Sequence, residues 1–281
     1  MIKALLGQIK RWYAIPYLFM CIIVTLQSAS YHLSANAFSW SWLGVSVAIA
    51  PLVLFMAIVY FLPWSGISNY IAVPIVAALL GAVLAIIEMR LLPTFYTLFF
   101  GLGGVLIYIF WYSDLDRRDN PALKIGAKLP EFTVQSIAGE ELHSSAFLGR
   151  KTLYIFYRGN WCPVCHAQIQ ALAEEYQEIQ RRGVAVVLIS PQSPKKSAEL
   201  AEQLNIAMQV CVDKDNRAAK RLGIVHQYGV PLGVWGYGGD TVLPTTLIVD
   251  ENGSIVYADL TDNFRVRPRV QTLINALDGV W

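Results

Sequence analysis

Two cysteines separated by two residues, Cys162 and Cys165, are the side chains best suited to chemistry in this 281-residue chain. They lie in the run YRGNWCPVCH, between an apolar stretch that predicts a strand and a stretch with helical periodicity. A thiol at a helix start meets unpaired backbone N–H groups and the positive end of the helix dipole, which favour its thiolate. Pro163 suits the first helical turn, because its missing N–H costs nothing there. Arg158 adds a positive charge, and the pattern predicts a reversible dithiol–disulfide site.

Two metal-based interpretations compete with this one. A zinc site needs about four ligands, whereas the chain offers one Cys-x-x-Cys pair with His166 and the distant Cys211. The residues from Cys162 to His166 also match the Cys-x-x-Cys-His pattern of c-type haem attachment. A haem domain would be largely helical, however, and this motif follows an apolar strand. A purely structural pair is the third alternative, and we expect thiol redox chemistry without a metal or cofactor.

The elements around the motif alternate between strand and helix patterns. The apolar runs that predict strands cover residues 152–157, 184–190 and 208–212. The periodic runs that predict helices cover residues 166–182, 194–204 and 215–222. Residues 245–249 and 254–258 flank a turn and predict a hairpin, and a last helix is expected over 268–277. This order predicts an α/β domain with a parallel sheet.

Charge divides the chain into two unlike parts. Hydrophobic residues make up 55% of the chain and charged residues 15%, which excludes a disordered or nucleic-acid-coating protein. Residues 1–113 hold only five of the 42 charged residues (22 Lys and Arg plus 20 Asp and Glu). We therefore expect a transmembrane part over 1–113, a linker over 114–127 and a water-soluble domain over 128–281. The last is long enough to fold without disulfides.

Four apolar stretches in the first part are each near the ~20 residues that a membrane-spanning helix needs. They run from Ile15 to Ala35, Trp40 to Pro63, Ile71 to Arg90 and Thr94 to Tyr112. Basic residues concentrate before the first stretch and after the last. The positive-inside rule then predicts a multi-pass protein of the inner membrane with both ends in the cytoplasm. If the third and fourth stretches form one re-entrant unit, the soluble domain faces the other side.

From about Lys128 onward, the chain resembles the peroxiredoxin-like branch of the alkyl hydroperoxide reductase and thiol-specific antioxidant (AhpC/TSA) family. The matching segments, in order, are YRGNWCPVC at 157–165, LISPQSP at 188–194, VDKDNRAAKRLGI at 212–224 and LPTTLIVDENGSIVYAD at 243–259. The resemblance implies a thioredoxin-like α/β domain, which follows the all-α transmembrane bundle of about four helices that the apolar stretches predict. It also implies that Trp161 shields the thiols. Pro244 would be a cis-proline beside the cysteine pair, presenting backbone to a bound partner, with Thr245 next to it.

The resemblance leaves the roles of the two cysteines open. Typical members carry Thr or Ser at the position of Cys162, which places Cys165 at the peroxidatic position, whereas in thioredoxins the first cysteine is the nucleophile. The arginine that the family carries near the late strand is missing, because Pro244, Thr245 and Thr246 occupy that neighbourhood. The expected substrate is a peroxide or a protein disulfide, and the expected partners are a thioredoxin-like or glutathione-like thiol reductant and the lipid bilayer. A non-enzymatic redox sensor is the remaining alternative.

Overall fold

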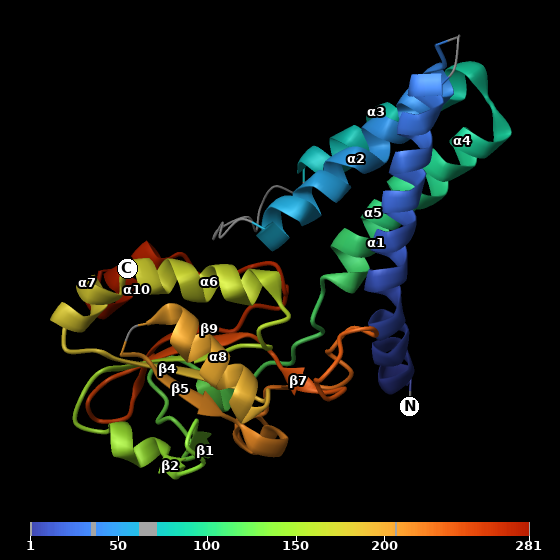
Figure 1. Ribbon diagram of the computed structural model, residues 1–281. Helices are drawn as coiled ribbons and strands as arrows, with labels where there is room; N and C mark the ends of the chain where they lie inside the picture. The colour runs from blue at the N-terminus through green and yellow to red at the C-terminus, as the bar shows by residue number, and fades with distance from the viewer. Residues whose placement is uncertain (1, 35–37, 62–71, 206, 281) are drawn as a thin grey trace.

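The computed structural model describes residues 2–34, 38–61, 72–205 and 207–280, and its N-terminal part consists of long helices (Figure 1). These are α1 (Ile2–Ser34), α2 (Trp40–Phe61), α3 (Ala72–Glu88) and the continuous run α4 (Leu91–Tyr96), η2 (Thr97–Gly103), α5 (Gly104–Leu106) and η3 (Ile107–Tyr112). The segments η2 and η3 are π-helical. A mixed sheet with its own helices follows, which confirms the predicted order of a helical part and an α/β part.

Within the described residues, three helices are long and apolar enough to cross a membrane, and they cover 6–34, 40–58 and 91–112. The third predicted stretch corresponds to α3, which is apolar but only 17 residues long. The described residues do not include Ala35, Pro63 and Ile71, which bound three of the predicted stretches. Helices α2 and α3 pack closely, because a Cβ atom on Gly44 would lie only 2.6 Å from the carbonyl oxygen of Gly81. Such small residues let apolar helices approach each other closely.

The second part contains a seven-stranded sheet. Its order is β2 (Glu141–His143), β1 (Thr133–Ser136), β5 (Gln209–Val212), β4 (Ala185–Ser190), β3 (Thr152–Phe156), β8 (Thr245–Val249) and β9 (Ile255–Asp259). The short strands β6 (Val225–His226) and β7 (Thr241–Val242) form a separate pair. Strands β3, β4 and β5 are parallel, whereas β8 is antiparallel to β3 and β9 is antiparallel to β8. The predicted parallel pairing is confirmed for β3, β4 and β5, and the predicted hairpin is confirmed for β8 and β9.

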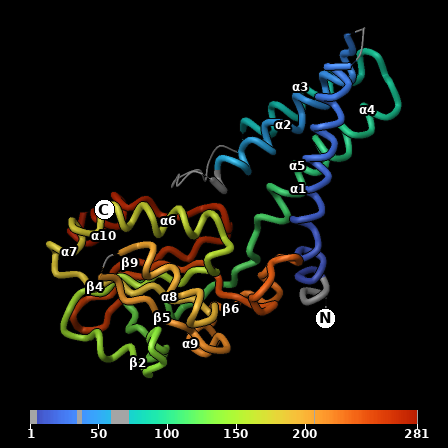
Figure 2. Tube along the Cα trace, viewed as in Figure 1, coloured from blue at the N-terminus to red at the C-terminus, as the bar shows by residue number. Residues whose placement is uncertain are grey.

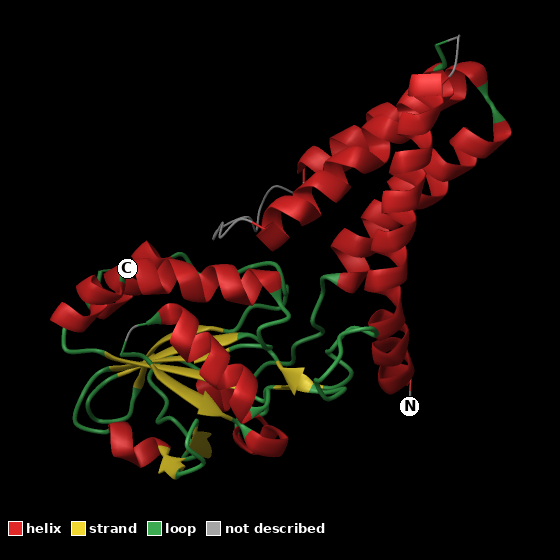
Figure 3. Ribbon diagram, in the orientation of Figure 1, coloured by secondary structure: helices red, strands yellow, loops and turns green. Residues whose placement is uncertain are grey.

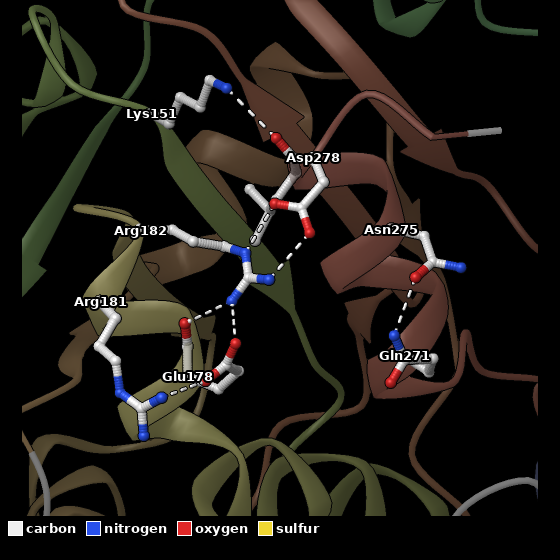
Figure 4. Close-up of polar contacts among 8 residues, drawn as sticks. Lys151, Glu178, Arg181, Arg182, Gln271, Asn275 and Asp278 are labelled. Carbon is white, nitrogen blue, oxygen red and sulfur yellow. Dashed lines mark hydrogen bonds and ion pairs between the residues drawn. The ribbon is translucent and has the colours of Figure 1, made fainter.

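Helices cover both faces of this sheet (Figure 3). One face carries α6 (Pro163–Glu174), α7 (Tyr176–Arg181), α8 (Pro194–Leu204) and α10 (Val270–Leu277), and the other carries α9 (Arg217–Arg221) and η5 (Ser144–Phe147). The short 3-10 turns η4 (Pro121–Leu123) and η6 (Lys214–Asn216) complete the set. The helix predicted over 166–182 is divided, because Glu175 leaves helical geometry. Arg182, after α7, pairs with Asp278 at the end of α10 at 2.7 Å (Figure 4).

Strand β3 positions the cysteine motif. Leu153 and Ile155 are buried on the face that α6 covers, and Tyr154 and Phe156 are buried on the opposite face. A central strand with both faces covered is a continuous apolar run, which explains why this strand was predictable. The chain leaves the carboxyl end of β3 and enters α6 through residues 157–162. Ligand sites of α/β sheets form at this end of the strands.

Residues of the predicted linker pack against the sheet. Leu115 and Leu123 are buried in the core on the α9 face. The exit of the last N-terminal helix also pairs with the segment after β9, since Phe264 N donates to Ser113 O at 3.1 Å and Leu115 N donates to Asp262 O at 2.6 Å. The end of the helical part and the segment that follows β9 are thus hydrogen-bonded to each other.

Candidate active site

The two thiols lie at the start of α6. Cys162 is the N-cap residue, with an extended backbone (φ −93°, ψ 107°), and Pro163 occupies the first helical turn as the sequence predicts. Cys165 follows in the same turn. Both cysteines are free, and their exposed fractions are only 2% for Cys162 and 0% for Cys165. The site is therefore a buried dithiol at a helix N-terminus.

Electrostatics distinguish the two thiols. Burial acts to raise the pKa of Cys165, but a hydrogen bond with Cys162, the nearby charge of Arg267 and the Arg158 backbone outweigh it and hold that pKa well below the ordinary value. The Nη2 atom of Arg267 donates to Cys165 Sγ at 3.5 Å. The same hydrogen bond with Cys165, together with burial, raises the pKa of Cys162. Cys165 is therefore the thiolate of the pair, and Cys162 is the thiol.

Aromatic and cationic side chains form the wall beside Cys162. The guanidinium of Arg158 lies 4.6 Å from the centre of the Trp161 ring and donates to Gly229 O. Trp161 in turn meets the ring of Tyr237 edge to face at 6.4 Å between centroids. Arg158 is 5% exposed, and its charge acts to lower the pKa of Cys162 against the larger opposing effects. The structure thus brings Arg158 and Trp161 to the thiols.

The arrangement at Pro244 differs from the expectation. The peptide bond before Pro244 is trans, as no described residue has a cis bond, so the expected cis-proline is wrong. Its carbonyl is also not free for a partner, because Arg117 Nη2 donates to Pro244 O at 2.7 Å and to Thr245 Oγ1 at 2.9 Å. Trans is the preferred state of X-Pro bonds, and the partly buried Arg117 already uses the carbonyl. Thr245 begins β8 opposite Phe156 of β3.

Comparison with known proteins identifies the sheet-containing part. Residues 125–258 match the sequence profile of the AhpC/TSA family. This region is an AhpC/TSA family domain. The chain is 29% identical over 164 residues to a putative peroxiredoxin bcp of Haemophilus influenzae, covering 56% of this chain and 97% of that protein. It is 24% identical over 153 residues to the thiol-disulfide oxidoreductase ResA of Geobacillus thermodenitrificans, covering 54% and 75%.

Among solved structures, the peroxidoxin BcpB of Mycobacterium tuberculosis matches the AhpC/TSA domain with a TM-score of 0.47 at 17% identity, over 57% of this chain and 99% of that one. The curated relatives are named as peroxiredoxins and thiol-disulfide oxidoreductases. The chain is therefore a thiol-dependent oxidoreductase, either a thiol peroxidase or a thiol–disulfide oxidoreductase.

Sequence reasoning missed two residues that shape the AhpC/TSA site. Arg267 comes from the segment between β9 and α10, 102 residues from Cys165, and nothing in that irregular segment marks it. Gln192 lies in the quoted run LISPQSP, so a signal was present. Its Oε1 accepts from Asn160 N at 2.9 Å and its Nε2 donates to the Tyr157 hydroxyl at 3.0 Å, which fixes the loop before α6.

The structure separates Cys211 from the dithiol, whereas His166 follows Cys165 directly in α6. Cys211 of β5 is buried in the core on the α9 face, whereas Cys162 and Cys165 belong to the core on the α6 face. Burial raises the pKa of Cys211 to about 11. Within the described ranges, no three His, Cys, Asp or Glu side chains converge as metal ligands. Cys211 therefore lies on the wrong side of the sheet to ligate a shared metal or to resolve an oxidised Cys165.

Proposed function

We propose that this protein is a membrane-anchored thiol peroxidase in which Cys165 attacks the peroxide and Cys162 resolves the product. The observation that carries the proposal is the inverted polarity of the pair. The pKa of Cys165 is held low by Cys162 and Arg267, while the pKa of Cys162 is raised. A thioredoxin-type exchanger attacks with its first cysteine, and here that cysteine is the poorer thiolate.

The reaction follows from these positions. The Cys165 thiolate attacks one peroxide oxygen, the O–O bond breaks, and the leaving oxygen takes a proton and departs as water or an alcohol. Cys165 is thereby oxidised to a sulfenic acid. The sulfur of Cys162 then attacks that of Cys165, water leaves, and a disulfide forms across the Cys-x-x-Cys motif. A thioredoxin-like or glutathione-like thiol supplies two electrons and restores both thiols.

Arg267 serves two steps in this scheme. In the resting protein its guanidinium stabilises the Cys165 thiolate at 3.5 Å. During attack, negative charge moves from sulfur to the peroxide oxygens, and a fixed cation beside the sulfur stabilises that charge as it develops. Arg158 contributes through its backbone N–H to Cys165 and through its ring contact with Trp161.

Burial favours a small substrate over a protein disulfide. The exposed fractions of Cys162 and Cys165 are 2% and 0%, so an incoming protein disulfide would need the surrounding wall to open, whereas a peroxide group is small. Exchange with protein disulfides is the second candidate, because thiol-disulfide oxidoreductases are among the relatives. A redox sensor would use the same thiols but would not consume reductant continuously.

The helical part is proposed as the anchor in the inner membrane. Its support is the set of three helices with the length and composition of membrane spans, together with the shorter apolar helix α3. Large apolar side chains on these helices are exposed, among them Phe19 (62%), Leu54 (62%) and Phe99 (61%). The basic residues that flank the apolar stretches support a cytoplasmic AhpC/TSA domain.

Peroxide consumption by the full-length protein in nanodiscs tests this proposal. We expect Cys165→Ser to abolish peroxide turnover with a thiol reductant. In Cys162→Ser, peroxide should oxidise Cys165 to a sulfenic acid, but no disulfide should form. Cys211→Ser is the matched control and should retain the wild-type rate. Disulfide reduction that depends on Cys162, without peroxide consumption, would establish the exchanger instead. Oxidation without sustained reductant use would establish a sensor.

A further inference from the structure

An uncharged loop between β6 and β7 contributes no reacting group to the reaction derived above. Its sequence from Gly229 to Gly239 is GVPLGVWGYGG, which contains no charged residue. Trp235, near its tip, is 89% exposed, the largest value of any tryptophan among the described exposed residues. The tryptophan ring is amphipathic and favours a membrane–water interface over bulk water, so an exposed ring of this kind suits an interfacial position.

The loop rests on the first helix of the N-terminal part. Leu232 N donates to the carbonyl oxygen of Arg11 at 2.9 Å. The backbone of Gly233 has a positive φ (+93°), and a Cβ atom there would lie 3.7 Å from Ile15 Cδ1. The tube in Figure 2 shows this orange loop reaching the lower part of α1. The contact falls where the basic start of α1, with Lys10 and Arg11, changes into its apolar run.

That level of α1 has the composition of a membrane–water boundary. Trp12 is 61% exposed beside the loop's contact point, and Lys10 Nζ lies 5.5 Å from the ring centre of Trp111 at the end of the last helix. Tryptophan rings prefer the headgroup region, and basic side chains there attract anionic lipids. The loop that carries Trp235 is thus attached to α1 at the level where Trp12 and Trp111 lie.

We propose that residues 231–238 dock on the bilayer surface, with the Trp235 ring in the headgroup region. The proposal rests on the membrane-anchored function proposed above. The occupant is lipid rather than a protein, because the loop is continuous with the boundary of a membrane-spanning helix and has no charged group with which to recognise a partner surface. The docked loop also borders the thiols, since its Tyr237 meets Trp161 beside Cys162. The bilayer therefore supports one wall of the dithiol site.

Fluorine NMR of the full-length protein in nanodiscs tests the docking. The eight tryptophans are replaced by 5-fluorotryptophan, and the Trp235→Phe and Trp12→Phe variants assign their two resonances by loss of a signal. Lipids with a nitroxide on the headgroup are then added. We expect the Trp235 and Trp12 signals to lose most of their intensity, and the signal of Trp161, assigned with Trp161→Phe, to lose less.

Each result has a distinct meaning. If Trp12 is broadened and Trp235 keeps its intensity, the loop does not dock, while insertion of the helices stands. If neither signal is broadened, the membrane anchoring itself fails and docking fails with it. A second comparison uses Trp235→Glu and, as a matched control, Leu148→Glu at another exposed apolar position (54%) of the AhpC/TSA domain. Both variants should turn over peroxide equally in detergent. In nanodiscs, only Trp235→Glu should shift the fluorine signal of Trp161 from its wild-type position.

Discussion

Replacing Arg267 with glutamine should raise the pKa of Cys165 and slow its reaction with peroxide. Arg267 is only 7% exposed, and its Nη2 atom lies 3.5 Å from Cys165 Sγ, so solvent screens the interaction little. A hydrogen bond to a charged group contributes about 1.5–3 kcal/mol, and about 1.4 kcal/mol corresponds to a factor of ten. At pH values below the Cys165 pKa of both proteins, we therefore expect Arg267→Gln to have a thiolate population and a peroxide rate about 10- to 100-fold lower than the wild type.

The assay follows the ultraviolet absorbance of the thiolate against pH, in parallel with the peroxide rate. In the wild type, the low pKa of Cys165 should keep the rate constant as pH falls below the ordinary thiol value of about 8.5, with a decline only near the lowered pKa. In Arg267→Gln that decline should begin at higher pH. Subtracting the Cys165→Ser titration isolates the signal of the reactive thiol.

Arg269→Gln provides the matched control. This residue is exposed and lies two positions further along the same segment, so its replacement removes an equal charge without removing the contact with Cys165. Equal midpoints and equal rates in the Arg267 and Arg269 variants would refute the assignment of thiolate stabilisation to the Arg267 guanidinium.

Two further predictions concern Gly159, beside the Trp161 ring, and His226 of β6. Gly159→Ala should reduce peroxide turnover, because Gly159 has φ +137° and a Cβ atom would lie 2.9 Å from the Trp161 ring; Gly139→Ala, at φ +90° in open space, should add backbone strain but leave turnover unchanged. Equal rates in these two variants would contradict a role for the ring position. His226 has a pKa lowered to about 3 by burial and by the charges of Arg158, Lys10 and Arg117. Its unfolded state therefore binds a proton below about pH 6.5 that the folded state does not, and stability should fall by about 1.4 kcal/mol per pH unit below that point. Thermal unfolding at about pH 7 and pH 5 should show a smaller pH dependence in His226→Gln than in the wild type, and an unchanged dependence would show that this histidine is not the cause.

Strands buried on both faces were predictable from the sequence. The run predicted over 152–157 corresponds to β3 (Thr152–Phe156), and the run over 245–249 has the bounds of β8. Strands β1 and β2 were missed, because they are short, carry polar residues and lie at one side of the sheet with exposed positions. A strand that buries only some of its side chains leaves a weaker apolar pattern.

The site was predictable only where its parts are neighbours in sequence. Cys162, Pro163 and Cys165 form a local motif, and a helix start gives that motif its meaning. Arg267 and Arg117 reach the same neighbourhood from distant segments, and only the folded chain shows that Arg267 meets a sulfur and that Arg117 meets the Pro244 carbonyl. The sequence lacks the arginine that the family carries near the late strand, and the fold supplies Arg117 there from another segment.

The pairing of Ser113 and Leu115 with the segment after β9 restricts how the dithiol can be presented. A domain on a free tether sweeps out a volume that grows with tether length and can swing toward its partners. Here Leu115 and Leu123 are buried, so little of residues 114–127 is available to act as a tether. In the proposed membrane-anchored protein, the thiols are therefore held at a fixed height and orientation above the lipid. A reductant must then diffuse to the membrane surface, and its encounter rate depends on how strongly that surface attracts it.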